Sequence, residues 1–97
     1  MRNRHLVSYD VSDPRRLRLV HRLLRGYGDS VQYSVFVCDL ARQERFELMH
    51  RLSELIHHKE DRVMLVDLGP VGGRGGQGWT FLGRSVPEEK APVAFIV

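Results

Sequence analysis

Apolar and polar residues alternate along several short segments of the chain, which predicts β-strands with side chains on two faces. Residues 4–11 alternate in this way, and residues 31–40 form either one bent strand or two strands broken near Tyr33-Ser34. Residues 62–68 are predicted to form a further strand, and residues 79–82 are a short strand candidate. Because the first three segments are apolar on both faces, something must cover the second face of the predicted sheet.

Residues 14–25 have the 3.6-residue periodicity of an amphipathic helix. Asp13 is a suitable N-cap, and Pro14 suits the first helical position. Gly26 or Gly28 is available to end the helix. Its apolar face is predicted to consist of Leu17, Val20, Leu24 and Tyr27.

A second helix is expected over about residues 41–58, with Asp39 as its N-cap. His57 and His58 then fall in its last turn, where a positive charge would suit the helix dipole. Its apolar positions recur at helical spacing and are Phe46, Met49, Leu52, Leu55 and Ile56.

The order of elements, β-α-β(β)-α-β, is typical of an α+β ferredoxin-like sandwich, with two helices on one face of an antiparallel sheet. Residues 1–82 are predicted to form this domain, and residues 83–97 a linker and a C-terminal strand at 93–97. The apolar second face and the spare strand together favour a homodimer. In that dimer the two sheets pack face to face and the terminal strand joins the edge of the partner's sheet.

Length and composition limit the chain to one small domain. It has 97 residues, of which 42% are hydrophobic, enough for a single two-layer core. The one cysteine, Cys38, excludes an intramolecular disulfide and is expected to be a core residue. No apolar run approaches the ~20 residues that span a bilayer, and no signal-peptide pattern opens the sequence. We therefore expect a protein of the reducing cytoplasm without membrane contact.

The basic residues are mostly arginines, and they are unevenly distributed. The net charge is only +3, but thirteen of the fifteen basic residues are Arg, and five lie between residues 14 and 25 without any acid. The planar guanidinium matches phosphate through two hydrogen bonds, so this helix is predicted to bind a polyanion. The alternative is the surface composition of an arginine-rich or thermophilic organism. The candidate nucleic-acid-binding residues are Arg15, Arg16, Arg18, Arg22 and Arg25.

Asp10 is the candidate catalytic and metal-binding residue. It ends an apolar strand on the face expected to meet a second subunit, where a carboxylate is costly unless it reaches solvent or a cation. Two copies near a two-fold axis would share Mg²⁺ or Mn²⁺, ions that activate water and hold a phosphodiester oxygen. The alternative is an exposed acid that caps the following turn.

Six glycines between residues 69 and 78 include a G-x-G-x-x-G match. That motif must open a helix to bind a dinucleotide, whereas here it precedes a strand-like stretch. We therefore expect a mobile hairpin loop. The five histidines have no metal-ligand spacing, so no zinc site is predicted.

Three separate segments resemble the small CRISPR-associated endonuclease family, the dimeric partner of the CRISPR integrase in spacer acquisition. They are Tyr9-Asp10-Val11-Ser12-Asp13, Val31-Gln32-Tyr33-Ser34-Val35-Phe36 and Glu60-Asp61-Arg62-Val63. The resemblance implies a ferredoxin-like homodimer with a swapped C-terminal strand, acting as a metal-dependent nuclease on RNA or DNA. It also implies a scaffold role, in which the dimer holds double-stranded DNA between integrase dimers.

Residue by residue, the resemblance places the metal on Asp10 and makes Tyr9 and Phe36 supporting residues. It places basic residues at the start of the first helix, here Arg15, Arg16 and Arg18. The chain departs from the family pattern at two positions. Ser30 stands where a basic residue is common, and Val37 where an acid is common.

Two functional hypotheses follow, a Mg²⁺-dependent endonuclease that uses Asp10 and a DNA-binding scaffold that uses the arginines. An RNA-recognition fold is less favoured, because the aromatic pattern expected on a central strand is absent. A small-molecule regulatory domain of the same fold would leave the arginines unexplained.

Overall fold

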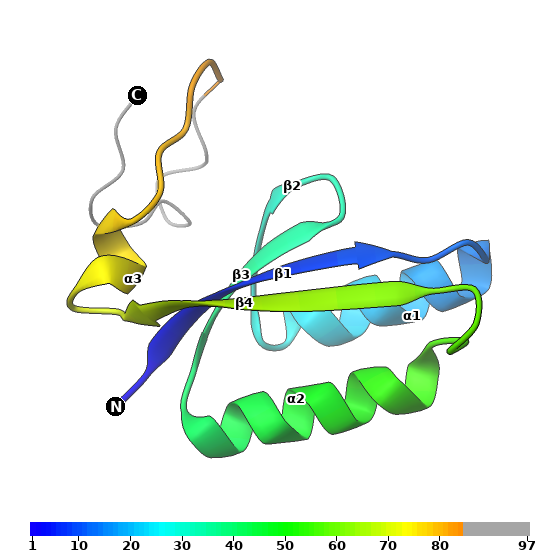
Figure 1. The fold of residues 1–97 in the computed structure, drawn as a ribbon. Helices are drawn as coiled ribbons and strands as arrows, with labels where there is room; N and C mark the ends of the chain where they lie inside the picture. The colour runs from blue at the N-terminus through cyan, green and yellow to red at the C-terminus, as the bar shows by residue number, and fades with distance from the viewer. Residues whose placement is uncertain (85–97) are drawn as a thin grey trace.

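The computed structural model describes residues 1–84, and the predicted linker and C-terminal strand lie outside the described residues. Four strands form one antiparallel sheet in the order β2-β3-β1-β4, and α1 and α2 lie on the same side of it (Figure 1). This is the predicted ferredoxin-like α+β arrangement. The elements are β1 (Asn3–Asp10), α1 (Pro14–Arg25), β2 (Gly28–Gln32), β3 (Val35–Leu40), α2 (Arg42–Leu55), β4 (Arg62–Pro70) and α3 (Arg74–Gln77).

The sequence signals around α1 and the first hairpin are confirmed. The Asp13 side chain accepts a hydrogen bond from Arg16 N at 3.0 Å, and Pro14 is the first helical residue. Gly26 ends the helix. The second β segment is broken at Tyr33-Ser34, where Ser34 adopts a φ of 61° and lets β2 turn back into β3. The alternative with two short strands is therefore the correct one.

The core lies between the sheet and the two long helices. Phe36, Leu24, Val7 and Val20 have no exposed surface, and Cys38 is also fully buried, as expected. Burial in this apolar layer raises the pKa of the Cys38 thiol to about 12, so the thiol is protonated at neutral pH. The buried core residues are Val7, Tyr9, Val11, Val20, Leu24, Phe36, Cys38, Leu40, Leu48 and Leu52.

The prediction for the second helix was wrong in three respects. The N-cap is Ala41, because Arg4 binds the Asp39 carboxylate at 2.7 Å and keeps Asp39 in β3. The helix ends at Leu55, and the two histidines expected in its last turn follow it. Phe46 and Met49 are exposed, and Leu48, which was not among the predicted positions, is buried together with the predicted Leu52. The apolar positions of α2 thus extend beyond the face that contacts the core.

The sheet face opposite α1 and α2 is called the open face below. Strand alternation and register place Leu6 between Val37 and Val66, and Ser8 between Val35 and Met64, on this face. Met64 is 52% exposed, and Leu6, Val35 and Val66 are partly exposed. The expected apolar second face is therefore present in the described chain, without a covering helix along most of its length (Figure 1).

The glycine-rich segment is folded, contrary to the expected mobile hairpin loop. It forms α3 and packs against β4 and β1 at one end of the sheet. A Cβ at Gly75 would lie 2.4 Å from Gly69 O and 2.9 Å from Arg4 Cβ, so the missing side chain permits this close packing. The Arg4 guanidinium carbon, Cζ, lies 5.9 Å from the centroid of the Trp79 ring. Residues 79–82 form no strand, so that strand candidate was wrong.

The longest helix of the described chain, α2, has 14 residues, and none of its helices is long and apolar enough to cross a membrane.

Candidate metal site and nucleic-acid interface

Asp10 is the last residue of β1 and lies on the open face. Its neighbours along the strand, Tyr9 and Val11, are buried in the core, so alternation directs the Asp10 carboxylate to the opposite side. Its side chain is exposed and has no hydrogen bond or ion pair with any described residue, although Arg62 is its partner in the strand register. The carboxylate is therefore free to bind a cation.

Among the residues that the structure describes, Asp10 is the carboxylate that ends β1 on the open face. No group of three or more His, Cys, Asp or Glu residues in the described chain is arranged to hold a metal ion. Mg²⁺ is commonly bound by one or two carboxylates together with water, so a free Asp10 fits this ion.

Arg16 and Asp61 fix the loops on either side of Asp10. Arg16 Nε lies 2.8 Å from Asp61 Oδ2, and Arg16 Nη2 contacts Glu60 at 3.2 Å. Asp61 also accepts hydrogen bonds from the backbone N of Ser12 and of His57, and its side chain has no exposed surface. The Arg16 guanidinium and these hydrogen bonds hold the pKa of Asp61 well below its usual range. This cluster ties the loop after β1 to the turn before β4.

The five arginines of α1 therefore differ in their surroundings. Arg16 is occupied by the two acids, and its side chain is 23% exposed. The other four are exposed and form no ion pair with described residues, namely Arg15, Arg18, Arg22 and Arg25. With no acid in the first turn of the helix, these four side chains keep their charge available to an anion.

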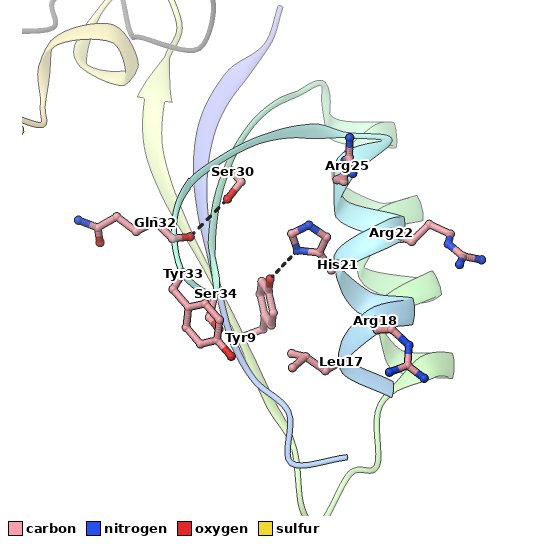
Figure 2. A pocket seen from close by; sticks show the side chains of 10 residues that line it. All are labelled: Tyr9, Leu17, Arg18, His21, Arg22, Arg25, Ser30, Gln32, Tyr33 and Ser34. Carbon is pink, nitrogen blue, oxygen red and sulfur yellow. Dashed lines mark hydrogen bonds between the residues drawn. The ribbon is translucent and has the colours of Figure 1, made fainter. Parts of the chain in front are cut away.

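Tyr9 and Phe36 lie on the helix side of the sheet, opposite Asp10. The Tyr9 hydroxyl and His21 Nδ1 are joined by a hydrogen bond of 3.1 Å (Figure 2). The His21 ring packs edge-on against Phe36, with 5.1 Å between the centroids. Burial, and to a lesser degree the nearby Tyr33, raises the pKa of Tyr9. The two predicted supporting residues thus position His21 within the chain, while their roles in a reaction stay predictions.

A pocket of about 540 Å³ opens between α1 and the β2–β3 hairpin (Figure 2). Tyr9 and His21 form its inner wall, Tyr33 stands at the hairpin end, and Ser30 and Gln32 contribute polar groups. Arg18, Arg22 and Arg25 line it from the helix.

Sequence reasoning missed three residues of this region, His21, Tyr33 and Asp61. The sequence placed Tyr33 either in a bent strand or beside a strand break and gave it no role of its own, although an aromatic residue beside a possible break was a usable signal. No spacing in the sequence links Asp61 to Arg16 or His21 to Tyr9, because these contacts depend on the tertiary fold.

The fold and this site define a small ferredoxin-like protein with a free strand-end carboxylate and a basic first helix. Residues 3–71 match the family described as CRISPR associated protein Cas2. Because the match covers more than half of the chain, the chain belongs to the Cas2 family of CRISPR-associated proteins.

Individual relatives agree with this assignment. The chain is 42% identical over 66 residues to a CRISPR-associated endoribonuclease Cas2 of Rhodospirillum rubrum. The match covers 68% of this chain and 65% of the relative, so the chain spans slightly less than two thirds of the length of that relative. The structure is similar to that of Streptococcus pyogenes Cas2, with 39% identity, a TM-score of 0.64 and coverage of 68% of this chain and 86% of that one. It is also similar to a hypothetical protein from Thermus thermophilus, with 28% identity, a TM-score of 0.70 and coverage of 72% and 85%.

Proposed function

We propose that this protein is a metal-dependent endonuclease that hydrolyses phosphodiester bonds of RNA or DNA during CRISPR spacer acquisition. The observation that carries the proposal is the exposed Asp10 carboxylate, which ends the central strand and has no partner in the described chain. The names of the curated relatives, CRISPR-associated endoribonucleases, support a nuclease.

A homodimer that packs through the open face would complete the site. Leu6, Val66 and Met64 leave apolar area exposed on that face, and burying such area favours association. Asp10 lies on the same face at the strand end, so a two-fold axis near that end would bring two carboxylates together. Only the dimer would then have two acids within reach of one ion.

Mg²⁺ or Mn²⁺ is the ion that paired Asp10 carboxylates would hold, and when bound it supplies Lewis-acid activation of water and of a phosphodiester oxygen. The Arg16–Asp61 cluster keeps the loop after β1 in place and so orients Asp10. The unpaired arginines of α1 bind the phosphate backbone and hold the strand in position.

The test is cleavage of labelled single-stranded RNA and double-stranded DNA by highly purified protein with Mg²⁺. Asp10→Ala is expected to reduce cleavage to the level of the parent treated with EDTA. Asp29→Ala is the matched control, because Asp29 is an exposed strand acid without a side-chain partner in the described chain, and it should cleave like the parent. Equal cleavage by Asp10→Ala and the parent would remove Asp10 from the mechanism.

A second function, a double-stranded DNA scaffold for the CRISPR integrase, is favoured by the four unpaired arginines of α1. Such contacts give affinity without sequence preference, and each phosphate contact steepens the salt dependence by about 0.9 in log–log slope. Here Asp10→Ala should bind duplex DNA and co-elute with the integrase like the parent. The double variant Arg18→Glu/Arg22→Glu should lose the DNA, and retention of normal duplex binding would contradict the scaffold function.

A further inference from the structure

The pocket between α1 and the β2–β3 hairpin has walls that differ in chemistry. Its lining residues include three arginines and one histidine but no aspartate or glutamate. Arg18, Arg22 and Arg25 line the pocket from α1, are exposed and have no ion pair in the described chain, and the side chains of Arg18 and Arg22 extend from the helix into solvent (Figure 2). A ligand that fits this charge carries an anionic group, which the flexible arginine side chains can reach from the helix.

An aromatic ring stands at the other side of the mouth. Tyr33 is 88% exposed, although a large aromatic side chain would bury apolar area if it packed on the core. The tight turn fixes its backbone, because Ser34 holds the left-handed conformation and its carbonyl accepts a hydrogen bond from Tyr9 N at 3.1 Å. Tyr33 is therefore presented to solvent by an ordered hairpin, next to the buried Tyr9 (Figure 2).

The inner wall of the pocket is held in place by contacts within the chain. The Tyr9–His21 hydrogen bond and the His21–Phe36 ring contact hold the imidazole in place, and Leu17 provides an apolar patch below it. The volume of about 540 Å³ falls within the size range of small-ligand sites. An exposed aromatic ring beside several unpaired arginines is the combination that proteins use to bind a nucleobase and its phosphate.

We propose that this pocket binds one unpaired nucleotide of single-stranded RNA or DNA, with the base stacked on Tyr33 and the phosphate held by the flexible arginine side chains of α1 that line the pocket. A base inside a duplex is paired and stacked on both sides, so it does not enter. The pocket therefore selects single-stranded over double-stranded nucleic acid. This inference rests on the proposed binding of nucleic acid by the arginines of α1 and adds a preference that phosphate contacts alone do not give.

The test compares fluorescence anisotropy of three labelled probes at one salt concentration, a single-stranded RNA, a single-stranded DNA of the same sequence and the matched DNA duplex. The variants are Tyr33→Ala, Tyr33→Trp and the control Phe46→Ala, which removes an equally large exposed ring from α2. Tyr33→Ala should weaken single-strand binding at least about fivefold and leave duplex binding unchanged, since one stacked base contributes that much affinity. Tyr33→Trp should keep single-strand affinity, because tryptophan also stacks.

The possible outcomes distinguish failure of the pocket proposal from failure of the proposed nucleic-acid binding. If the parent binds none of the probes, nucleic-acid binding by this chain is refuted and the pocket proposal with it. If the parent binds but Tyr33→Ala resembles Phe46→Ala, or loses duplex and single strand equally, only the pocket proposal is overturned. Among supporting outcomes, tighter binding of RNA than DNA would identify RNA as the ligand, and the reverse would identify DNA.

Discussion

The Arg16 guanidinium binds the Asp61 carboxylate through two nitrogen atoms, with Nε 2.8 Å from Oδ2 and Nη2 3.2 Å from Oδ1. The pair connects the start of α1 to the residue before β4, across 45 positions of sequence. Arg15, the preceding residue, is exposed and has no such partner. Adjacent arginines in one helix thus have different surroundings, and this difference can be measured.

Arg16→Gln should lower the melting temperature by about 5 °C, because it leaves the solvent-inaccessible Asp61 carboxylate without its cation. Arg15→Gln is the matched control and should melt within about 1 °C of the parent, since it removes an exposed, unpaired charge. Duplex DNA affinity should show the opposite order, with the larger loss for Arg15→Gln. Circular dichroism and anisotropy measure the two effects, and equal melting temperatures would contradict the structural role of Arg16.

Asp61 also predicts how stability depends on pH. Its pKa is lower in the folded protein than in the unfolded chain, where an aspartate titrates near about 4. The stabilisation by Asp61 is therefore complete above that value and is lost as the pH falls toward the folded pKa. In urea unfolding of the parent and of Asp61→Asn between pH 7 and about pH 3, the difference in stability should be constant down to about pH 5 and narrow as the pH falls below about 4. A constant gap between them would show that the charge of Asp61 is not responsible.

Phe36 and Phe46 provide a matched pair for the core. Phe36 has no exposed surface and contacts both Tyr9 and His21, whereas Phe46 is 76% exposed on α2. Phe36→Ala should reduce the free energy of unfolding by about 3–5 kcal/mol, and Phe46→Ala should change it by less than about 0.5 kcal/mol. Chemical denaturation gives both values, and a small effect at Phe36 would mean that the core repacks.

Gly75 tests whether the glycine-rich segment is packed in solution. Gly75→Ala would put a methyl group against the Gly69 carbonyl, whereas a Cβ at Gly72 meets nothing within 4 Å. Because Trp79 is the only tryptophan and its indole N donates to Gly75 O, its fluorescence reports on this contact. The emission of Gly75→Ala should shift to longer wavelength, and that of Gly72→Ala should match the parent. An unshifted spectrum for Gly75→Ala would mean that the segment does not rest on β1 and β4.

The sequence was sufficient for the order of elements because the signals there are local. Asp13-Pro14 begins α1 through contacts within three residues, and alternation identified the three main β segments without knowledge of their neighbours. Asp39 misled for the same reason. Its suitability as an N-cap is a local property. The register of β1 with β3 places Arg4 opposite Asp39, and the Asp39 carboxylate forms an ion pair with Arg4 instead of capping α2.

The glycine segment and the pocket were harder to predict for different reasons. Because glycine has no side chain, it permits both a flexible backbone and close packing of one backbone segment against another. Composition therefore does not distinguish a flexible loop from the tight contact at Gly75. The pocket combines Tyr9 of β1, His21 of α1 and Tyr33 of the turn between β2 and β3. Asp10 was identified because a carboxylate at the end of an apolar strand is conspicuous on its own. No pattern of the single sequence joins residues that meet only when α1 covers the sheet.

Tyr9 and Asp10 are consecutive residues that point to opposite sides of β1, one toward the pocket and one toward the open face. A slip of β1 by one position against its neighbours would put the carboxylate into the core and the phenol outside. Mutations that relax the register of this strand should therefore damage both surfaces at once. The two surfaces are separated by the thickness of a single peptide chain. A shift of the strand that changes one surface therefore also disrupts the other.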